Sequence, residues 1–474
     1  MGEQPVSVFV GRDEQLSVLD GLLDRVAQDT GGKPGKALLI RGRRRVGKSR
    51  LVEEFLSRVD VPHVYFTAST RSTSEELRLF AEEVSASSMP GADLFAAVTL
   101  TSWEGALRLL AAAVPDNGPS VLVIDEVPYL TVSDPAFEGT LQKVFDRELS
   151  RHHLLFVGVG SDVAMMEALN EYGRPFHQRA TEMVVPPLAP SEVAGMLHLD
   201  PADAFDAYLV TGGLPLILDE WPAGASLWQY LEQALASPTS ALLVSAERAL
   251  AAEFPAETQA RGVLAAIGAG ERTFSNIGRS AGIALPSLPR ALDTLKAKRA
   301  VAAELPLSTR KSSQTRYRVA DPYLRFWLTF LGPHLPEVER GRGDRILARL
   351  HSSWSSWRGR AIEPVLREAL DRLPVDRRPS DMGVVGAYWT RSNDPEIDVV
   401  VADRYPVARR VLALGSIKWL ETAPFDERDH AELLEHRRQL PGADEKTPVF
   451  AVSRAGCSVK GLRSFHPEEL LAAW

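Results

Sequence analysis

Short apolar runs alternate with amphipathic stretches along the first 220 residues of the chain. Each run is long enough for one buried strand, and the runs lie at residues 37–40, 63–67, 121–124, 154–159 and 182–185. Residues 9–23 repeat leucine at helical spacing, which places Leu16, Leu19, Leu22 and Leu23 on one face of a helix. Strands that alternate with helices predict an α/β fold, with a parallel sheet covered by helices on both faces.

Residues 255–320 follow a different order, in which helices come first and a strand pair comes last. A helix is expected over residues 286–299, with a buried face formed by Leu288, Leu292 and Leu295 and an opposite face formed by Ser287, Arg290, Thr294 and Lys298. Residues 301–319 predict a hairpin that contains Arg310, Lys311, Arg316 and Arg318. This order predicts a winged helix, which either contacts DNA through its polar face or serves only as a packing module.

A glycine-rich motif follows the first predicted strand. Residues 42–49 read GRRRVGKS, and a helix-like stretch comes next. A strand, a loop of this spacing and a helix predict a P-loop, whose backbone N–H groups surround phosphate oxygens. Lys48 is expected to reach the β- and γ-phosphates, and the Ser49 hydroxyl to bind Mg²⁺. The expected nucleotide contacts are Gly42, Arg43, Arg44, Arg45, Val46, Gly47, Lys48, Ser49 and Arg50.

Three further positions are candidate catalytic residues of the same site. The strand at residues 121–124 runs into Asp125 and Glu126, which are expected to hold the metal and to polarise an attacking water. Ser161 follows the next strand, where a side chain can reach the γ-phosphate; a helix N-cap is the alternative. Arg174, after Gly173 in a loop, is a candidate arginine finger or γ-phosphate sensor, with an ordinary surface arginine as the alternative. The helix at residues 9–23 is expected to lie beside the nucleotide as a lid.

The last part of the chain carries an incomplete nuclease pattern. Alternation at residues 396–402 places Glu396 and Asp398 on one face of a strand and Ile397, Val399 and Val401 on the other. On the next strand Ser416 and Lys418 share a face, and Glu363 lies on an upstream helix. The set Glu363, Asp398 and Lys418 matches the frame of a metal-dependent PD-(D/E)XK nuclease site. Ser416 stands where that pattern needs a carboxylate, so we expect the fold without efficient cleavage.

Length and composition limit the remaining possibilities. A chain of 474 residues predicts about three domains, and an apolar content of 45% is enough for ordinary cores. A net charge of -8 argues against a uniformly basic surface but allows a local basic face. The single cysteine, Cys457, cannot form an internal disulfide, and no apolar run reaches the ~20 residues that span a bilayer. The N-terminus has no export signal, and Val6 stands where myristoylation needs Ser or Thr, so we expect a cytoplasmic protein outside the membrane.

Together the motifs GRRRVGKS, VLVIDEVPYL, GGLP, RYRVADPYLRFW and the EIDVVVA–GSIKW pair resemble the archaeal-type ATPases, which are related to the AAA+ and STAND classes. The resemblance covers nearly the whole chain. It implies a P-loop ATPase domain at residues 1–220 with a helical lid region to about 254, a winged helix at 255–320, a connector at 321–345 and a DUF234 domain of nuclease-like fold at 346–474. It also implies ATP, with Mg²⁺, as the nucleotide, and an association with DNA or with defence and mobile-element functions.

Three functions are compatible with these observations. The first is a slow ATPase switch that repositions a DNA-binding winged helix and an inactive nuclease-like domain. The second is an ATP-regulated, metal-dependent DNA nuclease. The third is a nucleotide-gated adaptor that binds a protein partner without nucleic acid. A homo-oligomer is compatible with each of them.

Overall fold

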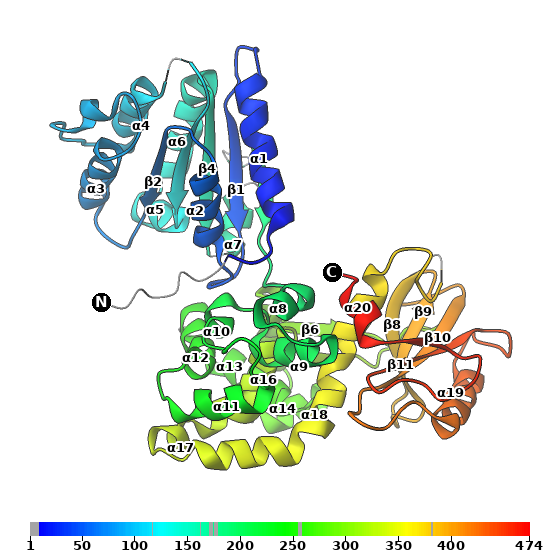
Figure 1. Cartoon of the computed structure of the whole chain (residues 1–474). Coiled ribbons are helices and arrows are strands. Elements are labelled where there is room, and N and C mark those ends of the chain that lie inside the picture. The colour runs from blue at the N-terminus through cyan, green and yellow to red at the C-terminus, as the bar shows by residue number, and fades with distance from the viewer. Residues whose placement is uncertain are drawn as a thin grey trace. The chain divides into compact units, whose positions relative to one another are not determined.

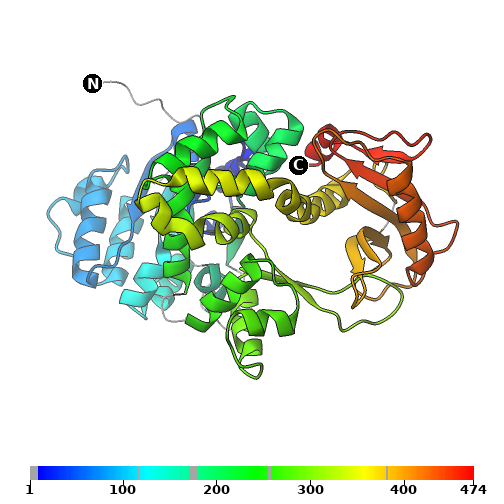
Figure 2. The same ribbon diagram turned by 90° about the horizontal axis from the view of Figure 1, so that it is seen from below.

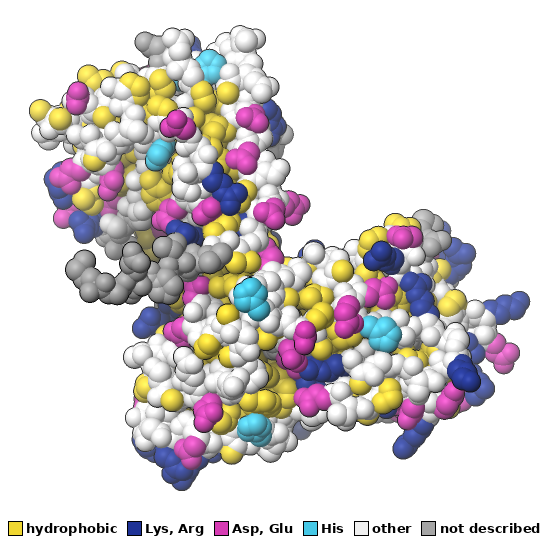
Figure 3. Space-filling model, in the orientation of Figure 1, with side chains coloured by type: hydrophobic (Ala, Val, Ile, Leu, Met, Phe, Trp, Pro, Cys, Tyr) yellow, Lys and Arg dark blue, Asp and Glu magenta, His cyan; other side chains and the backbone are white. Residues whose placement is uncertain are grey.

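The computed structural model describes residues 9–115, 117–161, 163–169, 174, 179–254, 258–380 and 383–474. The expectations that concern Val6 and Gly173 lie outside these residues. The chain forms two compact units, Met1–Pro187 and Leu188–Trp474. Within the described residues, every helix is too short or too polar to cross a lipid bilayer. On the face drawn in Figure 3, acidic and basic side chains are interspersed, with no large patch of one sign.

The first unit is built on a parallel sheet of five strands in the order β2-β3-β4-β1-β5. All five predicted strands are present, at β1 (Lys36–Arg41), β2 (His63–Thr67), β3 (Ser120–Asp125), β4 (Leu154–Gly160) and β5 (Ala180–Val184). Every residue of β3 and β4 is buried, as expected for central parallel strands with helices on both faces.

Helices cover both faces of this sheet (Figure 1). Helix α1 (Asp13–Gln28) buries the four predicted leucines and packs on α2 (Lys48–Arg58) and β4. The opposite face carries a core centred on Phe66, Phe80 and Trp103, whose rings meet edge to face or tilted. The other helices of the unit are α3 (Thr73–Ser85), η1 (Ala92–Phe95), α4 (Trp103–Ala113), α5 (Val127–Ser133), α6 (Phe137–Arg147), η2 (Leu149–Arg151) and α7 (Val163–Leu169).

The second unit begins with helices that the sequence had grouped with the ATPase domain as a lid region. Leu188, Val193 and Leu197 belong to the same apolar core as Leu292 and Phe326, which explains why the compact first unit ends at Pro187. The helices of this part are α8 (Pro190–Leu197), α9 (Pro201–Thr211), α10 (Pro215–Leu218), α11 (Leu227–Ala236), α12 (Ala241–Glu253), α13 (Thr258–Gly268), α14 (Phe274–Ser280) and α15 (Leu288–Ala297).

A hairpin and a connector follow. Strands β6 (Val301–Glu304) and β7 (Arg316–Val319) pair antiparallel, as the sequence predicts. The connector is buried through Phe326 and Leu331. Its helices are α16 (Pro322–Phe326), a π-helical turn η3 (Trp327–Leu331), η4 (Gly332–His334) and α17 (Leu335–Glu339), and they lead into the long helix α18 (Gly343–Arg372).

The C-terminal part is a mixed five-stranded sheet in the order β12-β11-β10-β9-β8. Strands β8 and β10 flank β9 antiparallel, whereas β10, β11 and β12 are mutually parallel. The elements are β8 (Val384–Trp389), β9 (Glu396–Ala402), β10 (Val411–Lys418), α19 (Glu427–Gln439), β11 (Val449–Ser453), β12 (Arg463–Phe465) and α20 (Pro467–Leu471).

Two sets of contacts join this sheet to the rest of the second unit. The loop at residues 305–315 extends from the β6–β7 hairpin to the C-terminal strands (Figure 2), where the fully buried Leu307 joins their core and donates its N–H to the Ala387 carbonyl. The buried Asp206 of α9 pairs with Arg358 of α18 at 2.8 Å and with Arg454 after β11 at 2.9 Å. A buried carboxylate with two arginine partners is a geometrically specific contact, so it fixes how these elements meet.

Candidate functional site

The P-loop lies where the sequence predicts it, between β1 and α2. An added Cβ at Gly42 would lie 2.4 Å from the Val185 carbonyl oxygen, so a side chain does not fit there. Gly47 is the N-cap of α2 with φ 88°, a conformation that glycine adopts without strain. Both glycines of the motif are therefore required by the local geometry, and the loop leads directly into a helix N-terminus.

Lys48 is held inside this loop. Its Nζ donates to the Gly42 and Arg43 carbonyls at 2.9 and 3.0 Å, which uses two of its three N–H donors. Burial lowers the pKa of Lys48 to about 8, although the carboxylates of Glu126 and Asp125 favour its charged form. One donor and a positive charge remain for an anionic ligand.

Ser49 and Asp125 meet beside the lysine. The Ser49 hydroxyl donates to Asp125 Oδ2 at 2.7 Å, and the Glu126 N–H donates to Asp125 Oδ1 at 2.8 Å. A hydroxyl and a carboxylate in contact supply the oxygen ligands that Mg²⁺ prefers. The two residues therefore fit the expected metal site.

Glu126 has a strained backbone and a fixed side chain. Its φ of 56° and ψ of 44° lie in the left-handed region, which residues other than glycine rarely adopt and which clusters at functional sites. The Ser161 hydroxyl donates to Glu126 Oε1 at 2.7 Å, and the Ser161 N–H lies 3.4 Å from Oε2. Ser161 therefore positions the carboxylate of the candidate catalytic base.

The remaining P-loop candidates lie at its edge. Arg44 donates to the hydroxyl of Tyr129 at 3.1 Å, and Arg50 lies 3.8 Å from Glu53 along α2. Val46 is buried and accepts a hydrogen bond from Arg12 at 3.0 Å. Arg43 and Arg45 complete the loop, and Arg45 has φ 68°. The structure therefore brings Lys48, Ser49, Asp125, Glu126 and Ser161 together, with the other loop residues around them.

Arg174 lies apart from that group. Its guanidinium pairs with Glu138 of α6 at 2.6 Å, and the Glu138 carboxylate is buried. Burial raises the pKa of Glu138, and the charge of Arg174 opposes this. The role of Arg174 as an arginine finger stays a prediction, and in this structure its partner is a carboxylate of its own unit.

Two residues of the site were not predicted from the sequence. Tyr65 of β2 donates its hydroxyl to Asp125 Oδ2 at 2.8 Å, and Arg12 supports the loop through Val46. Strands β2 and β3 pair in parallel with Thr67 level with Asp125, which brings Tyr65, two residues earlier, within reach of the carboxylate. The sequence could have indicated Tyr65 only if this pairing had been assumed. Arg12 has no comparable signal, because it acts across 34 positions of the chain.

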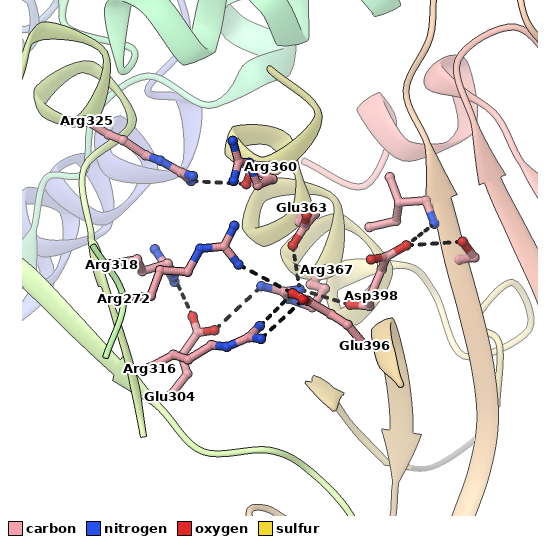
Figure 4. Close-up of polar contacts among 12 residues, drawn as sticks. Arg272, Glu304, Arg316, Arg318, Arg325, Arg360, Glu363, Arg367, Glu396 and Asp398 are labelled. Carbon is pink, nitrogen blue, oxygen red and sulfur yellow. Dashed lines mark hydrogen bonds and ion pairs between the residues drawn. The ribbon is translucent and has the colours of Figure 1, made fainter. Parts of the chain in front are cut away.

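The candidate nuclease residues are only partly brought together. Glu363 and Asp398 line one cavity of about 440 Å³ with Glu396, Arg272 and Arg316 (Figure 4). Asp398 accepts hydrogen bonds from the Ser416 hydroxyl at 3.2 Å and the Ile417 N–H at 2.8 Å. Lys418 does not line this cavity and pairs with Asp429.

The charges of this cavity are compensated from within the protein. Burial, and then the neighbouring Asp398, raise the pKa of Glu363 to about 7. Arg316 bonds Glu396 through two contacts of 2.6 and 3.2 Å, and Arg272 lies 3.4 Å from the same carboxylate. Across the described ranges, no three His, Cys, Asp or Glu side chains are grouped to hold a metal ion.

The interior face of β9 also differs from the expectation. Val399 and Val401 join one core, whereas Ile397 joins the other core with Val400. The pairing of β8 with β9 shifts register between Gly386 and Tyr388. Such a bulge reverses the alternation of side chains, so the expectation that Ile397, Val399 and Val401 share one face was wrong.

Two protein families match separate parts of the chain. Residues 9–220 match the family described as an ATPase domain predominantly from Archaea, and residues 327–431 match DUF234, described as archaeal and bacterial proteins of unknown function. An uncharacterized protein of Methanocaldococcus jannaschii is 22% identical over 452 residues, which is 94% of this chain and 95% of the relative. The chain thus combines a P-loop ATPase domain of the archaeal type with a C-terminal DUF234 domain.

Solved structures give more distant likenesses. A Walker-type ATPase of Pyrococcus abyssi has a TM-score of 0.48 at 20% identity, covering 69% of this chain and 99% of its own. The ORC2 protein of Aeropyrum pernix, in ADPNP–ADP complexes, has a TM-score of 0.45 at 15% identity, covering 74% and 96%. Likenesses at this level do not bear on function.

The lowered pKa of Lys48 predicts a pH dependence of ATP binding. Below pH 8 the ammonium is charged and can meet the phosphates; above it the free protein loses this charge. ATP affinity is expected to fall about 10-fold between pH 7 and pH 9, as follows from a pKa of about 8. Titration with a fluorescent ATP analogue measures this. Lys48→Arg stays charged throughout and should show a flatter profile; an equally steep profile would assign the effect to another group.

Tyr65→Phe is expected to weaken Mg²⁺ binding and so to raise the Mg²⁺ concentration that the site requires. The change removes the hydroxyl that orients Asp125, and loss of such an outer partner typically costs about 10-fold in metal affinity. The measurement is the Mg²⁺ concentration for half-maximal ATP hydrolysis. Tyr129→Phe is the matched control, because its hydroxyl bonds Arg44 instead, and it should change this concentration less than about 2-fold. If both variants changed the half-maximal Mg²⁺ concentration equally, the assignment of Tyr65 to the metal site would be wrong.

Proposed function

We propose that this chain is a slow ATP-hydrolysing switch, in which the nucleotide state of the first unit controls nucleic-acid binding by the second. The observation that carries the proposal is the convergence of Lys48, Ser49, Asp125, Glu126 and Ser161 beside one P-loop. This set supplies a phosphate-binding cation, oxygen ligands for a metal and a carboxylate positioned as a base.

Each residue has a separate task. The free donor of Lys48 binds phosphate oxygens, and the Ser49 and Asp125 oxygens would hold Mg²⁺. When bound, Mg²⁺ neutralises phosphate charge and thereby favours displacement at phosphorus. Glu126 accepts a proton from the attacking water. The hydrogen bond from the Ser161 hydroxyl fixes the orientation of the Glu126 carboxylate. Loss of that hydroxyl would therefore lower the turnover rate. Slow turnover is the property that lets such a site act as a timer.

Nucleic-acid contact is assigned to α15, in a winged helix formed by α13, α14, α15, β6 and β7. Leu288, Leu292 and Leu295 are buried, whereas Ser287, Arg290 and Lys298 are exposed. Of the cations in the predicted hairpin, Arg316 pairs with Glu396 and Arg318 with Glu304 at 2.5 Å, whereas Arg310 and Lys311 are exposed. The support for DNA therefore rests on the exposed polar face of α15 and on these two loop cations.

The DUF234 domain is assigned a binding role on an inactive nuclease-like fold. Ser416 supplies a hydroxyl in place of a carboxylate, and Lys418 pairs with Asp429 outside the cavity of Glu363 and Asp398. A lysine tied to another carboxylate is not placed to orient a water at Asp398. The nuclease alternative would require both contacts to rearrange.

A DNA-binding measurement tests the coupling. Glu126→Gln should bind a labelled duplex with affinities that differ at least ~5-fold between saturating Mg-ATP and Mg-ADP, a usual size for coupling between two sites. Binding should weaken as salt rises, because phosphates are neutralised by protein cations. Replacing both Arg290 and Lys298 by Ala should weaken binding about 10-fold, whereas Arg345→Ala, an exposed arginine of α18, should not. Equal affinities in both nucleotide states, or no effect of the double variant, would favour a protein adaptor.

A further inference from the structure

A second cavity lies in the second unit, between the end of α13, strand β7 and helix α18. Its volume is about 680 Å³, which is in the range of sites for small organic ligands. Five arginines line it: Arg272, Arg318, Arg325, Arg349 and Arg360. None of the described residues that line it is Asp or Glu. The charged side chains that line the cavity are therefore positive, which favours the binding of an anion.

Three of these arginines have carboxylate partners outside the lining. Arg318 pairs with Glu304 at 2.5 Å, Arg349 with Glu337 at 2.8 Å, and Arg272 with Glu396 at 3.4 Å. These pairs orient the guanidinium groups, and each group retains N–H donors beyond those used in its pair. Figure 4 shows the guanidinium groups of Arg272 and Arg318 directed at Glu396 and Glu304, and that of Arg325 directed at Arg360.

Arg325 and Arg360 differ from the other three. Arg325 donates to the backbone carbonyl of Arg360 at 3.1 Å, and within the described part of the chain neither guanidinium forms a salt bridge. Burial lowers the pKa of Arg325 to about 10; Glu363 opposes this, while Arg272, Arg318 and Arg360 add to it. Arg325 therefore stays charged at neutral pH, in a partly buried place where like charges repel it. An anion in the cavity would relieve this repulsion.

The rest of the lining suits a phosphate attached to a ring system. Hydroxyls of Ser353 and Ser356 on α18 can donate to phosphate oxygens, and Tyr317 and Trp357 add aromatic surface. Arginine matches phosphate oxygens through two parallel N–H bonds, which a single point charge cannot do. A cavity of this volume exceeds the needs of inorganic phosphate alone.

We infer that this cavity is a second binding site, separate from the P-loop, for a nucleoside phosphate. The ligand is either a free nucleotide or one nucleotide of a strand, and the shared chemistry is a phosphate held by Arg325 and Arg360 with a base beside the aromatic side chains. The site does not use α15 or the P-loop residues, so it is independent of the switch proposed above.

Equilibrium binding to the full-length Lys48→Ala chain tests this site with little contribution from the P-loop. The probes are pyrophosphate, ATP and a short DNA single strand. At least one is expected to bind, and Arg360→Ala in the same chain is expected to weaken that binding about 10-fold or more. Arg345→Ala, which removes an exposed arginine of the same helix outside the cavity, should change it less than about 2-fold. Binding of ATP identifies a free nucleotide, and binding of the strand alone identifies nucleic acid.

A second variant, at another lining residue, distinguishes loss of the site from misfolding of Arg360→Ala. Ser356→Glu adds a carboxylate at an exposed lining position and should weaken the same probe by repulsion and by pairing with the arginines. No binding of any probe, or equal binding by the parent, Arg360→Ala and Ser356→Glu, would overturn the site. ATP hydrolysis by Arg360→Ala with Lys48 intact should match the parent, so failure of this site and failure of the P-loop assignment give different results.

Discussion

Glu126→Gln is expected to slow ATP turnover by about 10²- to 10⁴-fold while ATP binding stays within about 2-fold of the parent. The amide keeps the shape of the side chain and can still accept from Ser161, but it cannot take a proton from water. The carboxylate acts in the transition state and need not contact the bound nucleotide. The substitution is therefore expected to lower the turnover rate and to leave the ATP affinity nearly unchanged. Measuring steady-state phosphate release and ATP affinity side by side separates the two effects.

Glu104→Gln is the matched control for that variant. Glu104 lies on α4, where it pairs with Lys143 at 2.8 Å and not with the P-loop. It should hydrolyse ATP at the parental rate. Hydrolysis by Glu126→Gln at the parental rate would show that another group is the base.

Lys48→Ala is expected to abolish the stabilisation of the protein by Mg-ATP. A ligand at 100 times its Kd stabilises the folded state by about 2.7 kcal/mol, which raises the Tm of a unit of this size by several degrees. Without the ammonium, the β- and γ-phosphates lose the one cation that the loop encloses. Measured with Arg360→Ala also present, which impairs the second cavity, the Tm shift of the variant should therefore fall below about 1 °C at the same ATP concentration.

The control for this variant is Lys143→Ala, which removes an exposed lysine of the same unit. Its Tm shift with Mg-ATP should equal that of the parent. A full shift that persists when Arg360→Ala is added to Lys48→Ala, so that the second cavity is also impaired, would contradict the assignment of the P-loop.

The first unit could be predicted closely from the sequence because its information is local. Central parallel strands are apolar along their whole length, so the strand at residues 121–124 was recognisable without its neighbours. The P-loop residues are consecutive, and parallel topology brings Asp125 and Glu126 to the same edge of the sheet as Lys48. Tyr65 and Arg12 were missed because their roles depend on contacts between distant segments.

The second unit contains more that local patterns could not reveal. The bulge in the pairing of β8 with β9 reverses the alternation of inward and outward side chains after Ile397. No glycine or proline at that position of β9 indicates the bulge in the sequence. Lys418 pairs with Asp429 because α19 begins beside β10, which only the three-dimensional arrangement decides. The burial of Leu307 in the C-terminal core likewise anchors the loop of the predicted hairpin, a contact that depends on a distant segment of the chain. Strand positions were thus more predictable than partners of side chains.

Single-turnover hydrolysis tests whether the P-loop site cleaves ATP in a metal-dependent reaction. The full-length chain, in excess over ATP labelled at the γ-phosphate, is mixed with Mg²⁺ and the release of phosphate is followed over time. Phosphate release is expected to go to completion with Mg²⁺ and to stop when the metal is removed by EDTA. ATP that stays bound and intact for hours in Mg²⁺, at the same level as in EDTA, would contradict this expectation.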